Sequence, residues 1–214
     1  MRILVKYNKY DNKEIRFNSL KRIKNYHNVV YIDCWNNRLT SLPELPNSLQ
    51  ELDCYENQLS KLPKLPNSLE KLDCSNNQLK SLPKLPNSLQ TLNCHQNQLR
   101  ELPELSNKLI ELNCDYNKLT TLPKLPNSLE KLDCSNNQLT SLPKLPNTLK
   151  GLYFSNNQIT SLPKLPNSLK RLLCRNNKLT LLPELPNSLQ ALYCGNNQFI
   201  NKYKYKYKYL NDFC

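Results

Sequence analysis

Apolar and polar residues alternate in short stretches that recur along the chain every 20 residues. In one unit, Leu52 and Cys54 alternate with Glu51, Asp53 and Tyr55. Such alternation predicts a short β-strand with one buried face. Strands that recur with the same sense must run parallel, so the nine copies predict a curved parallel sheet about 40 Å long. Further leucines in each unit, between the strands, are expected to point into the core.

Prolines follow the same period and determine how the chain returns from one strand to the next. All 15 lie in Leu-Pro-x-Leu-Pro elements such as Leu62-Pro63-Lys64-Leu65-Pro66, one copy having Ser106 in place of its second proline. Proline lacks the N–H that a helix needs and favours extended backbone before it. The return path is therefore predicted to be polyproline-II-like with short 3-10 turns. Asn57 and its equivalents, just after each strand, are predicted to bond buried loop carbonyls.

Together these positions give the pattern L-x-x-L-x-(L/C)-x-x-N-x-L, which resembles the leucine-rich-repeat family. The Leu-Pro-x-Leu-Pro element is similar to the subtype found in secreted effectors of enteric bacteria. The strand cysteines, with the Asn-, Lys- and Tyr-rich background, are also similar to leucine-rich-repeat proteins of large DNA viruses. The resemblance implies a repeat solenoid, with a parallel β-sheet on the concave side, an extended or 3-10 convex side and little α-helix.

The repeat divides the chain into three parts. Residues 1–28 break the period and are expected to cap the first repeat. Within them, Ile3 to Val5 would add a strand, and Ile15 to Ile23 would form a short helix or a turn. Residues 29–200 hold the nine strand motifs. Residues 201–214 contain alternating Lys and Tyr, which fits either a capping edge strand or a low-complexity tail.

All nine cysteines fall on the 20-residue period, and the eight that belong to strand motifs are expected to be buried, reduced and structural. Phe154 occupies the same position in one repeat, so the thiol is dispensable there. No Cys-x₂-Cys pair offers a zinc site, and we expect neither metal nor cofactor. The N-terminal apolar run is too short for a signal peptide, and no stretch is long enough for a membrane span. These features predict an intracellular, cytoplasmic protein, which would act in the host cytoplasm if it came from a pathogen or virus.

The formal net charge of +13 is concentrated at the ends of the chain. Residues 1–28 hold eight Lys or Arg and two acids, whereas residues 29–150 hold 13 of each. A nucleic-acid-binding protein usually carries a continuous basic stripe. Binding of nucleic acid or an anionic surface through the basic ends therefore stays an alternative to protein binding.

Specificity in this architecture is expected at the variable, outward-facing strand positions. Tyr, Trp and Arg commonly anchor protein interfaces. Two groups have this character: Tyr153, Leu173, Tyr193, Arg171 and Arg175 at one end, and Trp35 with Tyr55 and Tyr31 at the other. Burial under the C-terminal tail or under the N-terminal cap is the competing explanation for each group.

A row of Asp33, Asp53 and Asp73 on successive strands also needs an explanation, because like charges at that spacing repel. Hydrated aspartates that favour the strand-to-turn geometry, a bridging cation and a basic partner all remain open. Lys71 is expected to offset part of the repulsion.

No catalytic residues are predicted. His95 has Ser75 and Asp115 as expected neighbours, but an open sheet offers no pocket that excludes water. The bacterial effectors often carry a C-terminal ubiquitin-ligase domain with a catalytic cysteine, and only 14 residues follow the last repeat here, so we expect no such activity. The sequence thus predicts a monomeric, non-catalytic module that binds an unidentified protein partner on its concave face.

Overall fold

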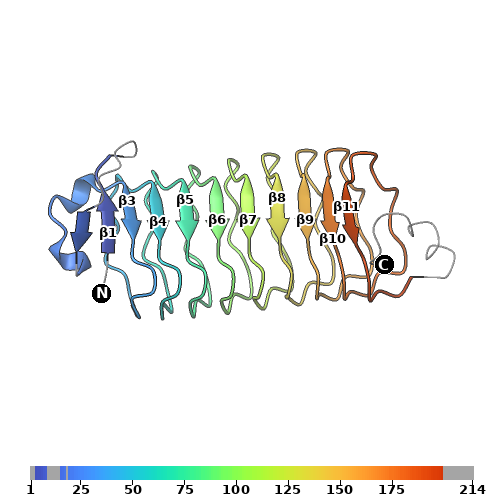
Figure 1. The fold of residues 1–214 in the computed structure, drawn as a ribbon, viewed down its shortest axis with the longest axis horizontal. Coiled ribbons are helices and arrows are strands. Elements are labelled where there is room, and N and C mark those ends of the chain that lie inside the picture. The colour runs from blue at the N-terminus through green and yellow to red at the C-terminus, as the bar shows by residue number, and fades with distance from the viewer. Residues whose placement is uncertain (1–2, 9–14, 18, 200–214) are drawn as a thin grey trace.

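The computed structural model describes residues 3–8, 15–17 and 19–199, which form one curved solenoid around an 11-stranded sheet (Figure 1). Nine short parallel strands follow one another along the solenoid. They are β3 (Tyr31–Asp33), β4 (Glu51–Asp53), β5 (Lys71–Asp73), β6 (Thr91–Asn93), β7 (Glu111–Asn113), β8 (Lys131–Asp133), β9 (Gly151–Tyr153), β10 (Arg171–Leu173) and β11 (Ala191–Tyr193).

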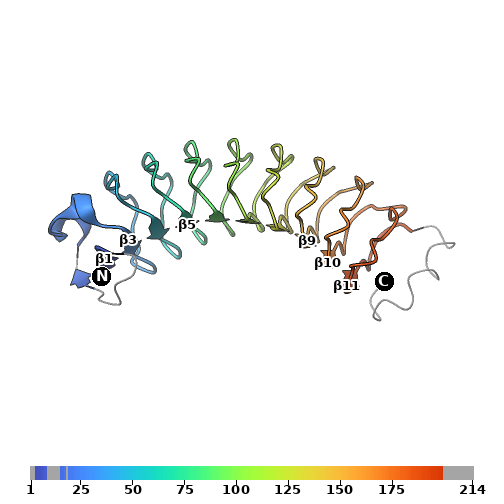
Figure 2. The same cartoon turned by 90° about the horizontal axis from the view of Figure 1, so that it is seen from above.

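Each repeat pairs with the next at an offset of 20 residues, so equivalent side chains stack in columns. Ile32 pairs with Leu52, and Leu52 pairs with Leu72. Figure 2 shows the strands on the inner side of the arc and the return paths on its outer side. The predicted parallel sheet on the concave side is confirmed.

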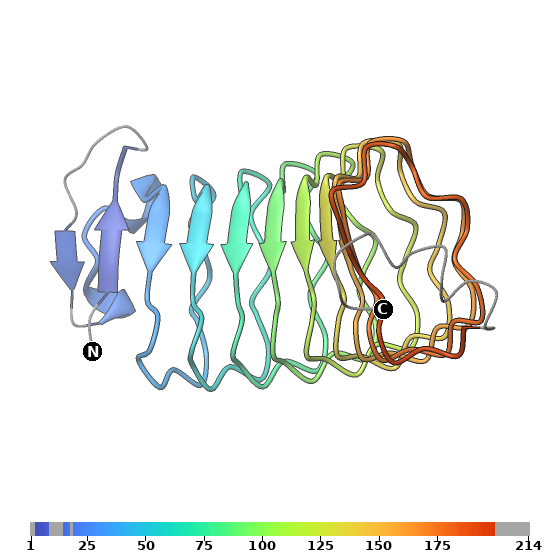
Figure 3. The ribbon, with the colours of Figure 1, turned by 45° about the vertical axis from the view of Figure 1, so that its right-hand side comes forward.

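The inward columns form one continuous apolar core between the sheet and the return path. Leu52 is 2% exposed and Cys54 is fully buried, and their equivalents in the other repeats are buried as well. Phe154, which replaces a cysteine, is also fully buried. The oblique view in Figure 3 shows the coils toward the C-terminal end stacked with nearly the same outline. An apolar column therefore tolerates a change of side chain without a change of backbone path.

A buried asparagine after each strand joins neighbouring repeats. The Asn117 Nδ2 donates to the carbonyl oxygens of Cys94 and Cys114 at 3.0 and 3.2 Å. Its Oδ1 accepts the Leu99 N–H at 3.0 Å. Equivalent bonds form at Asn57, Asn77, Asn97, Asn137, Asn157, Asn177 and Asn197. The predicted role of this column is confirmed.

The return paths are extended, as the prolines require, and a single turn closes each of them. In the turn before β5, the Leu69 N–H donates to the Pro66 carbonyl at 3.1 Å. The Ser68 hydroxyl donates to the carbonyls of Asn47 and Leu49 in the preceding repeat. The i→i+3 bond between Leu69 and Pro66 is an isolated turn of the expected 3-10 type, and it recurs in the other return paths. Between residues 39 and 199 these turns do not lengthen into 3-10 helices, which occur in residues 20–28 instead.

Residues of the N-terminal cap extend the sheet past the first repeat. Strand β1 (Ile3–Lys6) pairs antiparallel with both β3 and β2 (Ile15–Phe17). The 3-10 helices η1 (Leu20–Arg22) and η2 (Tyr26–Asn28) complete the cap. Ile15 and Phe17 thus lie in a strand and Leu20 in a 3-10 helix. No helix in the described part of the chain is long and apolar enough to cross a membrane. The expected Lys/Tyr cap or tail at 201–214 lies outside the described residues.

We predict that Asn117→Ala lowers the free energy of unfolding by about 2 kcal/mol, because it leaves the buried Leu99 N–H without a partner and removes one of the two amide donors to each of the Cys94 and Cys114 carbonyls. Urea denaturation measures the change. Asn127→Ala is the matched control, since Asn127 is exposed and the bond from Thr148 ends on its backbone carbonyl. The control should change stability by less than about 0.5 kcal/mol. Equal losses in both variants would contradict the role assigned to the asparagine column.

Candidate protein-binding surface

The central outward column of the concave sheet changes character along the solenoid. On the first six repeat strands it carries carboxylates and amides, and on the last three it carries apolar or aromatic side chains. In order, the column reads Asp33, Asp53, Asp73, Asn93, Asn113, Asp133, Tyr153, Leu173 and Tyr193. The concave face therefore has a polar half and an apolar end.

Two aspartates near the start of this column, Asp53 and Asp73, differ in how many hydrogen bonds their carboxylates accept from the protein. The Asp73 carboxylate accepts bonds from the Ser75 hydroxyl at 2.6 Å and from the Asn93 amide at 2.8 Å. Asp53 accepts a single long bond, from the Tyr55 N–H at 3.5 Å. Burial, then the neighbouring carboxylates Asp73 and Asp33, raise the pKa of Asp53 to about 7. Its proton equilibrium is thus shifted into the physiological range.

Lys71 does not offset this repulsion, contrary to expectation. Its ammonium group pairs with Glu51 at 3.1 Å, because the two side chains occupy the same column on adjacent strands. Asp53 and Asp73 help to line a shallow groove of about 420 Å³ that runs over β3 to β8. Among the described residues, no group of three or more His, Cys, Asp or Glu side chains is placed to hold a metal ion.

The apolar end of the column forms a compact surface, which we call the C-terminal patch and define as Tyr153, Leu173, Tyr193, Arg171 and Arg175. Leu173 lies in register between Tyr153 and Tyr193, and all three side chains are partly exposed. The Arg175 guanidinium lies 5.1 Å from the centre of the Tyr193 ring, a cation–π distance. The structure thus brings these five predicted site residues together on β9, β10, β11 and the residues just after β10.

Gly151 shapes this patch in a way that the sequence did not reveal. A Cβ atom at Gly151 would lie 3.0 Å from Cε2 of Tyr153. The ring of Tyr153 therefore packs over its own strand, in the space that a side chain at Gly151 would otherwise occupy. The signal in the sequence is that Gly151 stands in an outward column where the other repeats carry a side chain.

Trp35 and Tyr55 form a separate aromatic pair at the other end of the sheet. Their rings stack with centroids 5.2 Å apart and planes 5° from parallel. Trp35 is 39% exposed, so the N-terminal cap does not bury it. Tyr31 is not part of this stack, because its outward column lies on the other side of the central one, where Lys6 approaches its ring at 5.2 Å.

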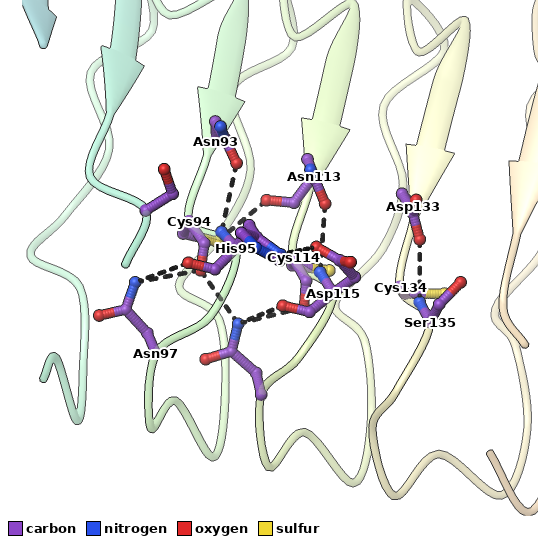
Figure 4. Close-up of polar contacts among 12 residues, drawn as sticks. Asn93, Cys94, His95, Asn97, Asn113, Cys114, Asp115, Asp133, Cys134 and Ser135 are labelled. Carbon is purple, nitrogen blue, oxygen red and sulfur yellow. Dashed lines mark hydrogen bonds and ion pairs between the residues drawn. The ribbon is translucent and has the colours of Figure 1, made fainter. Parts of the chain in front are cut away.

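His95 lies on the rim of the concave face and contacts Asp115 (Figure 4). Its ring also packs edge-on against the Tyr116 ring. Its Nδ1 is 2.5 Å from the Asp115 carboxylate. Burial raises the pKa of Asp115, although its bond to His95 acts in the opposite direction. Ser75 was the expected hydroxyl neighbour of His95. It is 4% exposed, and its hydroxyl donates a hydrogen bond to Asp73. The Ser75–His95–Asp115 arrangement that catalysis would need is therefore not assembled.

The cysteine column consists mainly of buried, unreactive thiols. Cys34, Cys54, Cys74, Cys94, Cys114, Cys134 and Cys174 are free and buried. Burial raises the pKa of Cys34 and Cys174 to about 12, so these thiols stay protonated and unreactive at neutral pH. Cys194 is disulfide-bonded, and the expectation that every cysteine is reduced is wrong at this position.

We predict that Asp53→Asn stabilises the protein above pH 7. The pKa of Asp53 is about 7 when folded against an ordinary 3.8. The folded state thus binds the extra proton between these values, and stability falls as pH rises through this window. Because Asp53 is only partly buried, solvent screening reduces the gain to about 1 kcal/mol. Urea denaturation at pH 4 and pH 8 should show the gain only at pH 8.

Asp133→Asn is the matched control, because Asp133 lies in the same column between uncharged Asn113 and Tyr153. It should give no comparable gain at pH 8. An Asp53→Asn effect of the same size at both pH values would show that charge repulsion is not its origin.

Comparison with known proteins agrees with this architecture. A family profile described as Leucine Rich repeats (2 copies) matches residues 67–107 and 128–167. No curated protein matches the sequence. Among solved structures, YopM from Yersinia enterocolitica is similar with 44% identity and a TM-score of 0.76, over 77% of this chain and 37% of that one. The YopM leucine-rich effector protein from Yersinia pestis is similar with 42% identity and a TM-score of 0.69, over 77% and 54% of the two chains.

A domain of InlJ from Listeria monocytogenes that includes a cysteine ladder is also similar, with 29% identity and a TM-score of 0.71, over 80% of this chain and 40% of that one. The chain thus spans between about a third and just over half of the length of these three proteins. These similarities agree with the repeat length, the extended return path and the in-register sheet described above. The chain is a leucine-rich-repeat protein with 20-residue repeats.

Proposed function

We propose that this chain is a non-catalytic interaction module that binds a protein partner on its concave face. The observation that carries the proposal is the in-register row of Tyr153, Leu173 and Tyr193, which lies on an outward sheet face beside two arginines. Exposed apolar side chains in a row on a sheet are uncommon unless another surface covers them. The leucine-rich-repeat fold is a typical protein–protein interaction scaffold, which supports the same conclusion.

Trp35 and Tyr55 form a second contact point in this proposal. Stacked aromatic rings that remain exposed offer a rigid surface at low entropic cost, and Trp, Tyr and Arg dominate binding energy in many interfaces. A partner that covers both the aromatic pair and the C-terminal patch would span most of the arc. The similarity to YopM, one example of which is titled an effector protein, supports an intracellular role on host components.

The test is a pull-down that compares three forms of the protein. Tyr153→Ala/Leu173→Ala/Arg175→Ala should reduce recovery of the partner at least tenfold, since it removes the apolar row and its flanking cation. Leu181→Ala is the control, because Leu181 is 46% exposed but lies on the return path. It should leave recovery unchanged. Unchanged recovery with the triple variant would overturn the assignment of the site.

A second candidate function is binding of nucleic acid or another anionic surface. The observation in its favour is a row of exposed lysines, Lys124, Lys144 and Lys164, on successive return paths. Glu104 and Glu184 bound this row, so the stripe is short. If the row binds nucleic acid, affinity for a DNA duplex should fall more than tenfold between 50 and 200 mM salt, as measured by fluorescence anisotropy. A salt-independent pull-down of a protein would favour the first candidate.

A further inference from the structure

We propose that the C-terminal patch binds an extended acidic–apolar–acidic segment of the partner, with carboxylates two residues before and two residues after one large apolar side chain. This inference rests on the proposed function and adds the chemistry of the partner. It comes from the way β10 and the two residues after it place an apolar residue between two cations.

The centre of the patch accepts an apolar side chain. Leu173 is partly exposed and lies between two tyrosines that pair with it in register. The ring of Tyr153 lies back over Gly151, so it lies along β9. An apolar side chain seated on Leu173 would contact aliphatic and aromatic surface on adjacent strands.

The two arginines flank this centre along the strand direction. Arg171 and Arg175 are two residues before and two residues after Leu173, so all three point to the same outward face. Arg171 is exposed, and Arg175 is held against the Tyr193 ring. Side chains on one face of extended backbone recur about every 6.7 Å. A partner segment that runs alongside β10 therefore presents its own alternate side chains at the spacing of the arginines, where carboxylates can form charge-assisted hydrogen bonds.

The charge around the patch favours an acidic occupant. Residues 136–199 contain seven Lys or Arg and one acid, whereas residues 29–135 contain 11 and 13. A basic segment would be repelled here and attracted to the other half of the arc. Arg175 already covers the Tyr193 ring, and Leu173 separates that ring from Tyr153, so the patch has no run of adjacent rings on which successive bases could stack. The patch therefore favours an acidic protein segment over a single-stranded nucleic acid.

Two capped peptides of identical composition test the spacing. In Gly-Asp-Ser-Phe-Ser-Asp-Gly the carboxylates lie two residues from the Phe, and in Gly-Ser-Asp-Phe-Asp-Ser-Gly they lie one residue from it and point to the opposite face. Each is titrated to millimolar concentration into the ¹⁵N-labelled full chain, with NMR as the readout. The first peptide should bind at least about fivefold more tightly and shift amides of β9, β10 and β11.

Two charge-matched variants separate the patch from the overall positive field. Arg171→Gln/Arg175→Gln should abolish the preference for the first peptide. Lys144→Gln/Lys164→Gln removes the same charge from exposed return-path positions and should retain the preference. Equal binding of both peptides, weakened equally by both variants, would show general anion attraction and overturn the inference. If neither peptide binds while the triple alanine variant still loses its protein partner, the inference is wrong and the proposed function stands.

Discussion

The buried asparagine column is the constraint on which the rest of this solenoid depends. A 20-residue repeat has no room for a helix, so backbone groups after each strand lack the partners that a helix would supply. One amide in each repeat supplies them, as Asn117 does for Cys94, Cys114 and Leu99. Because each amide bonds two successive repeats, a repeat cannot shift along the axis without leaving buried polar groups unpaired. The exact 20-residue register of the whole sheet follows.

That register separates residues that build the fold from residues that are free to vary. Inward apolar columns are confined to Leu, Ile, Cys, one Val and two Phe, since they meet the same kind of neighbours at every step. Outward columns meet the same backbone at every step, but their side chains are not constrained by the core. The change from Asp33 to Tyr193 along one outward column therefore costs the scaffold little. Recognition can evolve there without disturbing the asparagines or the leucines.

Much of the fold follows from the sequence because its determinants lie within one repeat. The alternation around Leu52 gives the strand, Pro63 and Pro66 give the extended return path, and Asn57 gives the link. The cap was less predictable, because Ile15 and Phe17 form a strand only where β1 provides an edge to pair with. The site was predicted as a set of residues, but its geometry was not. The position of the Tyr153 ring depends on an absent side chain at Gly151, and the partner of Lys71 depends on the preceding strand.

The two identical stretches at 62–79 and 122–139 show why reading one repeat at a time cannot define the surface. Asp73 lies between Asp53 and Asn93 and bonds the Asn93 amide, whereas Asp133 lies between Asn113 and Tyr153. Lys71 pairs with Glu51 and has Thr91 on its other side, while Lys131 adjoins Gly151, over which the Tyr153 ring lies. The same residues thus contribute to an acidic groove in one place and border an apolar patch in the other. In this architecture a binding property belongs to the junction between repeats, so two copies of one sequence can differ in function when their neighbours differ.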